Sequence, residues 1–114
     1  MSSGNYLVDS DTSLFSDITF DTTGGPINIA VNSSEQLLFT GLEIEVNGTN
    51  PVRIYSGNST SPVFNNPRIK FDNVEMDVEN DRTDLFTVFV ESTGPSDVTN
   101  VTVQDSTDFY GSIY

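Results

Sequence analysis

The chain contains no cysteine and no histidine, and it has only four basic residues against 17 acidic ones. The missing cysteines exclude disulfides and thiol nucleophiles, and the two absences together exclude zinc sites of the usual kind and histidine acid–base chemistry. The net charge of −13 also argues against nucleic-acid binding, because affinity for phosphate requires the opposite sign.

Long hydrophobic segments are absent as well. No apolar run approaches the roughly 20 residues that a membrane-spanning helix needs, so we expect no membrane insertion. No window repeats apolar residues at helical spacing, which predicts almost no helix. Residues 1–14 lack a basic start and a long apolar centre, so we do not expect a secretory signal there.

The acidic residues are mostly aspartate, and lysine is scarce. This composition resembles that of proteins from salt-loving archaea and their viruses, in which salt screens the repulsion between like charges. An ordinary acidic surface protein is the alternative interpretation.

An eight-residue pattern occurs four times and organises the rest of the chain. The copies are FDNVEMDV from Phe71, FSDITFDT from Phe15, FTGLEIEV from Phe39 and VTNVTVQD from Val98. The third residues are Asp17, Gly41, Asn73 and Asn100, which are types that tolerate left-handed backbone angles. Each copy therefore predicts a strand end, a bend at one residue and a second strand. The copies start 24, 32 and 27 residues apart, so the chain is a repeat protein with coils of unequal length.

Stacking the four copies predicts columns of equivalent residues. The inward columns are Ile18, Leu42, Val74 and Val101, followed by Phe20, Ile44, Met76 and Val103. Neighbouring strands lie about 4.8 Å apart, so these side chains would bury one continuous core. Tyr110 and Tyr114 are expected to cover the last coil.

The single bend residue and the apolar columns resemble the right-handed parallel β-helix of the pectate-lyase-like superfamily. The strings NPRIKFDNVEMDVEN and SDVTNVTVQDST are similar to its coils. The resemblance implies an all-β fold, a short right-handed parallel β-helix of about four coils over residues 13–114, with residues 1–12 as an N-terminal arm or cap. An antiparallel β-sandwich or jelly roll is the alternative, because short strands at this spacing suit it too.

Two outward columns carry most of the acids. Thr19, Glu43, Glu75 and Thr102 form one line, and Asp21, Glu45, Asp77 and Gln104 form the next. Stacked like charges repel by roughly 1 kcal/mol even in water. Glu43, Glu45, Glu75 and Asp77 are therefore the candidate calcium ligands, since hard cations bind several carboxylate oxygens. We favour a solvated acidic face instead, because no compact calcium-loop motif is present.

The sequence gives little support for catalysis. The tripeptide RIK at Arg68–Lys70 occurs in the polygalacturonase branch of the resembled superfamily, but the NTD, DD and GHG motifs of that branch are missing. Ile69 is better explained as a core residue, with Arg68 and Lys70 facing outward. A carboxylate pair among the 17 acids stays open as an alternative, although we expect no enzyme.

The insertion at residues 56–67 is rich in turn formers and is expected to bulge as a loop. Tyr55, Asn58, Phe64, Asn65 and Asn66 are candidates for stacking on glycans and bonding to them. Ordinary loop and core packing is the favoured alternative for these side chains. Four N-x-S/T sequons, at Asn32, Asn47, Asn58 and Asn100, are candidate glycosylation sites.

A short solenoid has open ends that need caps or partners. We therefore expect self-association or docking to other subunits, with glycans as further candidate ligands and no cofactor apart from the candidate calcium. The expected function is a non-catalytic structural component of a virion or cell-surface assembly, such as a spike, fibre or decoration protein, with a halophilic archaeal virus as one candidate source. A carbohydrate-binding or adhesin module is the first alternative, and a polysaccharide-active β-helix enzyme is the second. The expected location is a virion or the extracellular surface.

Overall fold

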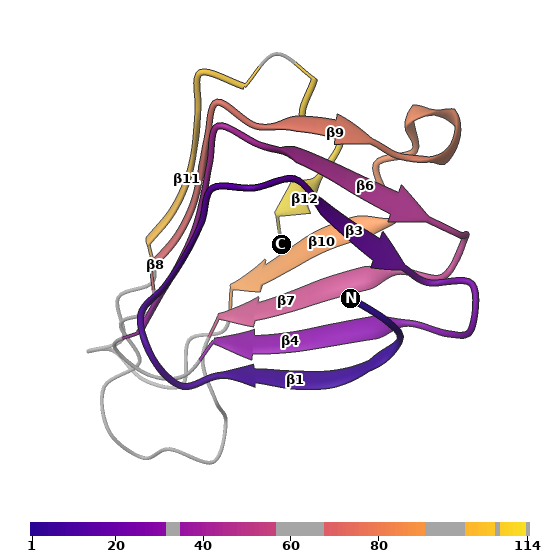
Figure 1. Cartoon of the computed structure of the whole chain (residues 1–114), viewed down its shortest axis with the longest axis horizontal. Coiled ribbons are helices and arrows are strands. Elements are labelled where there is room, and N and C mark those ends of the chain that lie inside the picture. Colours follow the sequence, from indigo (N-terminus) through magenta and orange to yellow (C-terminus); the bar gives the residue numbers. More distant parts are fainter. Residues whose placement is uncertain (32–34, 57–67, 91–99, 107, 114) are drawn as a thin grey trace.

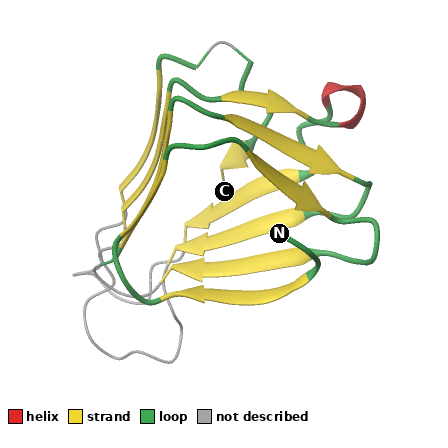
Figure 2. Cartoon of the chain, in the orientation of Figure 1, coloured by secondary structure: helices red, strands yellow, loops and turns green. Residues whose placement is uncertain are grey.

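The computed structural model describes residues 1–31, 35–56, 68–90, 100–106 and 108–113. Within these residues the fold is built of strands and one short 3-10 helix (Figure 2). The strands are β1 (Gly4–Val8), β2 (Thr12–Leu14), β3 (Ile18–Asp21), β4 (Ile27–Val31), β5 (Gln36–Thr40), β6 (Glu43–Asn47), β7 (Val52–Ser56), β8 (Arg68–Asp72), β9 (Glu75–Asp77), β10 (Phe86–Val90), β11 (Asn100–Gln104) and β12 (Ser112–Ile113), and the 3-10 helix is η1 (Glu79–Asp81). No helix of the described residues is long and apolar enough to cross a membrane.

Three sheets form three sides around a common interior (Figure 1). We call them sheet I (β1-β4-β7-β10-β12), sheet II (β11-β8-β5-β2) and sheet III (β3-β6-β9). Every strand pair is parallel. The chain passes through sheets I, II and III in turn, completes about four coils and begins another with β12. The predicted parallel β-helix is therefore confirmed, and the antiparallel sandwich is wrong.

Alternation of apolar and polar residues decides which side chains face the interior. In β4, Ile27, Ile29 and Val31 are buried, whereas the residues between them are half-buried on the outside. In β8, Ile69 and Phe71 point inward in the same way. Because the strands are paired in register, these inward residues lie in rows that run from coil to coil and close one continuous core.

Phe71 lies at the centre of a cluster of aromatic rings in that core. Its ring stacks on Phe39 with the centroids 5.0 Å apart, and it meets the edge of Phe86 at 5.8 Å. Phe109 approaches Phe71 from the next coil, at 5.0 Å. Offset and edge-on ring contacts of this kind add to the stabilisation that comes from burying the rings. The cluster therefore links coils two, three and four through side chains as well as through backbone pairing.

A residue with left-handed backbone angles follows each of the strands β5, β8 and β11. These residues are Gly41 (φ 63°), Asn73 (φ 53°) and Asp105 (φ 52°). The predicted bends at Gly41 and Asn73 are confirmed, but those at Asp17 and Asn100 are wrong. The connection from Leu14 to Ile18 is one residue shorter than the equivalent one in coil two, and it turns without a positive φ. Asn100 begins strand β11.

The predicted columns are correct for the middle coils and wrong for the outer ones. Ile44 pairs with Met76, and Glu43 with Glu75, as expected. In coil one the register differs by two residues, so that Ile18 lies opposite Ile44 and not opposite Leu42, while Phe20 lies opposite Val46. Two differences of one residue add up to this shift: Leu14, not Phe15, lies opposite Phe39, and the bend after it is one residue shorter. A shift of two keeps each side chain on its own face, so alternation alone could not detect it.

The fourth copy of the pattern belongs to a different sheet. Val101 and Val103 pair with Ile69 and Phe71 in sheet II, and Thr102 and Gln104 pair with Lys70 and Asp72. The predicted placement beside Met76 is therefore wrong. Asp108 occupies the next position in sheet III, where it bridges to Glu75. An alternating apolar strand fits either sheet, which is why the sequence could not assign it.

The two ends of the chain also join the sheets. Residues 1–12, expected as an arm or cap, contain β1 and the start of β2, and Ser2 pairs with Asp21 at the outer edge of β3. At the other end, Phe109 and Tyr110 are partly buried and pack against the core. Tyr114 lies outside the described residues. Gly111 is required beside Phe109, because a Cβ there would lie 2.5 Å from the phenyl ring.

The bend at Asn73 can be tested by substitution. Asn73→Val should lower the free energy of unfolding by about 1–2 kcal/mol, because a β-branched residue is strained at positive φ. Asn73→Gly is the matched control and should change stability far less, since glycine adopts this conformation freely. Urea unfolding followed by circular dichroism measures both variants. Equal stability of the two variants would contradict the assigned bend.

Candidate functional site

The outside of sheet III is mostly acidic. Glu43 pairs with Glu75, and Glu75 is bridged in turn to Asp108, so three carboxylate residues follow one another across coils two to four. Glu45 and Asp77 form a second such pair. The predicted neighbours Thr19 and Asp21 are displaced by the shift in coil one: Thr19 lies opposite Glu45 and Asp21 opposite Asn47. Asp108 takes the place expected for Thr102, which makes this ladder more acidic than predicted.

Nothing in the strands of sheet III balances these charges, since β3, β6 and β9 contain no lysine or arginine. Asp17 adds a further carboxylate at the end of the ladder, where its Oδ1 accepts a hydrogen bond from the Glu43 N–H at 2.8 Å. A shallow hollow lies between Asp17, Glu43 and Glu75. Directly opposed like charges destabilise a sheet, so the buried core beneath this face has to offset their repulsion.

The candidate calcium ligands Glu43, Glu45, Glu75 and Asp77 do share this face. In the described part of the chain, however, no three carboxylates are arranged to hold one metal ion. The solvated acidic surface and the calcium site both stay predictions for this face. A neighbouring hollow is lined by Tyr110 as well as by acids, and the negative charge of Asp81, with burial and Asp108, raises the pKa of the Tyr110 phenol.

The candidate glycan-binding residues fall on two kinds of position. Tyr55 lies on the outer face of β7, where its ring stacks on that of Phe89 from β10 with the centroids 5.1 Å apart. The pairing partner of Tyr55 on the other side is Ala30. Asn58, Phe64, Asn65 and Asn66 lie outside the described residues. A two-ring platform on the outer face of sheet I is therefore the part of this prediction that the structure can place.

The sequons are placed only in part. Asn47 is exposed at the end of β6. Its backbone carbonyl accepts a hydrogen bond from the Thr22 N–H at 2.8 Å. Asn100 begins β11. Asn32 and Asn58 lie outside the described residues. The RIK tripeptide is explained as expected: Ile69 is buried in the core, Arg68 is exposed and Lys70 is half-buried on the outside.

The two ends of the solenoid, for which the sequence predicted only caps, carry its most unusual surface. Every large hydrophobic side chain that is strongly exposed in the described residues belongs to the first or the last coil. They are Met1 (46%), Leu7 (52%), Phe15 (68%), Val103 (37%) and Ile113 (49%). The core residues that stay only partly buried lie there too: Tyr6, Val8, Leu14 and Ile18 at one end, and Val101, Phe109 and Tyr110 at the other.

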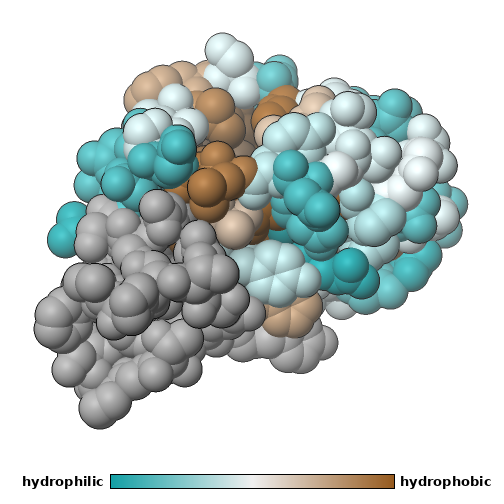
Figure 3. All heavy atoms as spheres, turned by 90° about the horizontal axis from the view of Figure 1, so that it is seen from below, coloured by the Kyte–Doolittle hydropathy of each residue, from teal (hydrophilic) through white to brown (hydrophobic). Residues whose placement is uncertain are grey.

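We call the first of these surfaces the N-terminal end face, formed by the partly buried inward residues Tyr6, Val8, Leu14 and Ile18. Leu7 and Phe15 lie beside it on the outside of the first coil, Leu7 in the outward row of Ala30 and Tyr55 and Phe15 directly after inward Leu14. Tyr6 lies across it and donates a hydrogen bond from its hydroxyl to the Ser2 carbonyl at 2.7 Å. In the middle coils the position equivalent to Phe15 is polar, as at Thr40 and Asp72. On the side of the molecule where β1 lies, the apolar surface is gathered in one area and is not scattered (Figure 3).

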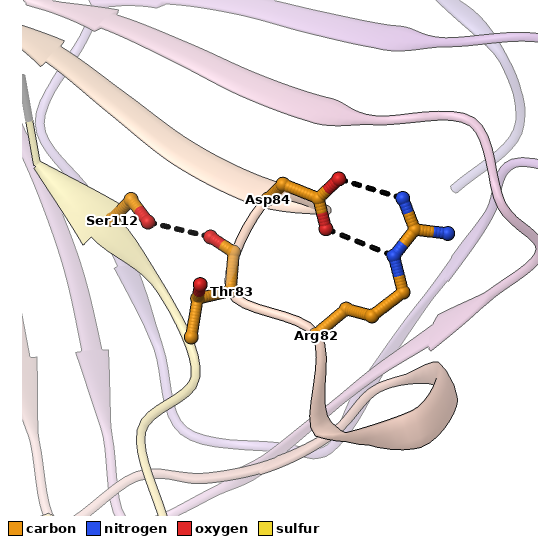
Figure 4. Close-up of polar contacts among 4 residues, drawn as sticks. All are labelled: Arg82, Thr83, Asp84 and Ser112. Atoms are coloured by element: carbon orange, nitrogen blue, oxygen red, sulfur yellow. Dashed lines mark hydrogen bonds and ion pairs between the residues drawn. The ribbon is translucent and has the colours of Figure 1, made fainter.

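The C-terminal end face is formed by Val101, Val103, Phe109, Tyr110 and Ile113. Its last strand is held by the Ser112 hydroxyl, which donates to the Thr83 carbonyl in the turn before β10 (Figure 4). Arg82 and Asp84 clamp the same turn with a two-pronged ion pair, at 2.6 and 2.9 Å. The hydrogen bond from Arg82 lowers the pKa of Asp84. This end is thus fixed in place although its apolar side chains are open to solvent.

Comparison with known proteins adds a family match. The model of the family described as "Domain of unknown function (DUF7305)" matches residues 1–114, which is the whole chain. No curated protein matches the chain. No solved structure matches it either.

The acidic ladder predicts a dependence on salt. Glu75→Gln should raise the free energy of unfolding by a few tenths to about 1 kcal/mol at low salt, because Glu75 stands between Glu43 and Asp108. The gain should shrink in about 1 M salt, where the Debye length is roughly 3 Å. Glu79→Gln is the matched control, since Glu79 lies in η1 outside the ladder. Chemical unfolding at the two salt concentrations gives the comparison, and equal gains in the two variants would refute the proposed repulsion.

Proposed function

Because the chain belongs to the DUF7305 family, a domain of unknown function, we propose a role from the structure: a non-catalytic structural component of a virion or cell-surface assembly, such as a spike, fibre or decoration protein. The observation that supports it is the concentration of exposed apolar side chains at the two ends of the solenoid. In the middle coils the inward side chains are covered by the coils on either side. The two ends are therefore the surfaces where a partner would remove the most apolar area from water.

The rest of the molecule suits such a role. The rows of the core and the ring cluster around Phe71 make a rigid body that can present its side faces at fixed positions. Exposed Asn47, in an N-G-T sequon, is compatible with an outer-surface location. The net charge of −13 and the acidic ladder support a salt-rich setting, such as that of a halophilic archaeal virus. The single-residue bends support a right-handed helix of the pectate-lyase-like type.

Fractionation of the producing cells tests the assembly role. The tagged chain should be found in released particles or in cell-surface material, and Leu7→Ser combined with Phe15→Ser should move it to the soluble fraction, because these side chains are exposed on the outside of the first coil, beside the N-terminal end face. Leu38→Ser is the matched control, since Leu38 is a half-buried outward residue of a middle coil. A wild-type chain that is entirely soluble, or a control variant released equally, would count against the assembly role.

A carbohydrate-binding or adhesin module is the second candidate, and the ring stack of Tyr55 and Phe89 is the observation that favours it. Aromatic faces pack well against the apolar faces of sugar rings, and Arg53 on the same strand supplies hydrogen-bond donors.

A glycan array separates the second candidate from the first. If the platform binds sugars, wild-type protein should bind at least one glycan and Tyr55→Ala should lose most of that signal, because one of the two stacked rings is gone. Tyr55→Phe is the control and should keep the stacking contribution. Absence of any glycan signal from the wild type would reject this alternative.

A further inference from the structure

Basic side chains are confined to the second part of the chain. Residues 1–52 contain no lysine or arginine, and the four basic residues are Arg53, Arg68, Lys70 and Arg82. The same stretch contains seven acids, namely Asp9, Asp11, Asp17, Asp21, Glu35, Glu43 and Glu45. The first coil is therefore acidic without any internal compensation from a basic side chain.

Carboxylates stand at all three corners of that first coil. Asp9 and Asp11 lie between β1 and β2, Asp17 lies between β2 and β3, and Asp21 ends β3. All four are exposed. Asp11 also holds coil two, because its Oδ1 accepts the Gln36 N–H at 3.1 Å. Burial raises the pKa of the Glu35 carboxyl, and Asp11 and Asp9 raise it further, which shows how closely the acids are crowded at this corner.

The strands of the first coil also have unpaired edges. β1 and β2 are the outermost strands of sheets I and II, and no described strand pairs with their outer sides. The edge of β3 shows how such an edge is filled. There Ser2 forms a parallel bridge with Asp21, and the Asp21 N–H donates to the Met1 carbonyl at 2.8 Å. Among the described residues, no strand pairs with the backbone groups of β1 that face away from β4, which makes that edge a template for an added strand.

The N-terminal end face thus combines three properties: an apolar centre, open backbone edges and an acidic rim. We propose that it binds an extended, lysine- or arginine-rich polypeptide segment of a partner protein, which adds as a strand along the outer edge of β1. This inference rests on the proposed assembly function and specifies its partner. Apolar residues of the segment would cover Tyr6 and Val8, which are only partly buried, while its basic residues would face the corner carboxylates.

Charge decides between this partner and a second copy of the chain. A second copy carries the same net charge of −13, so it brings repulsion to every corner of the first coil. A basic segment brings attraction to the same positions. The charge pattern therefore favours a heterologous basic partner at this end.

Fluorescence anisotropy with a labelled synthetic peptide of alternating lysine and valine tests the inference on the full chain. The peptide should bind, and the same peptide with glutamate in place of lysine should not. Asp9→Asn combined with Asp11→Asn should weaken binding by roughly tenfold, since two rim charges are lost. The matched control is Glu45→Gln combined with Asp77→Asn, which changes the net charge equally on sheet III and should leave the affinity within about twofold of wild type.

Hydrogen exchange locates the peptide. The β1 amides that face away from β4 should gain protection when the lysine peptide is bound, because the added strand supplies their partners. The Gly4 N–H already donates to the Pro26 carbonyl and should not change. Equal weakening by the control pair, binding of the glutamate peptide or no protection of β1 would overturn the inference. If the peptide fails while Leu7→Ser with Phe15→Ser still releases the chain from assemblies, the inference falls and the assembly function stands.

Discussion

The structure depends on parallel pairing that keeps equivalent residues of successive coils side by side. Once the register is set, each inward position must hold an apolar side chain in every coil, and each outward position meets its counterpart at about 4.8 Å. The row through Leu14, Phe39, Phe71 and Val103 shows the favourable side of this constraint. The row of Glu43 and Glu75 shows the unfavourable side, because identical charges are brought together by the same rule. Cohesion and repulsion therefore share one geometric cause.

This constraint also explains which parts of the fold were predictable from sequence. Coils two and three have bends of equal length, so the pattern beginning at Phe39 could be superimposed directly on the one beginning at Phe71. The parallel β-helix followed from that comparison. The first coil was misaligned because Leu14, not Phe15, lies opposite Phe39 and because its bend is one residue shorter. Together these differences shift β3 by two residues, which period-two alternation cannot detect. The fourth copy was assigned to the wrong sheet because V-T-V fits an inward–outward alternation in any of the three.

The end faces were harder to predict than the core for a different reason. Tyr6, Leu14 and Ile18 alternate with polar residues in the same way as fully buried core residues do. Only their position in the first coil leaves their side chains partly exposed. Exposure here is a property of the stack and not of the local sequence. Phe15 was a partial signal: it begins a copy of the pattern like Phe39 and Phe71, yet it is 68% exposed because Leu14 fills the inward position.

The unequal spacing of the coils has a consequence for how such a molecule can change over evolutionary time. Each coil contacts mainly the coils directly before and after it, so gain or loss of one complete turn leaves every remaining row aligned. Height is then adjustable in steps of about 4.8 Å, while the outer connections vary in length without disturbing the interior. A protein built this way can therefore change its length by duplication of whole coils without a change to its interior rows.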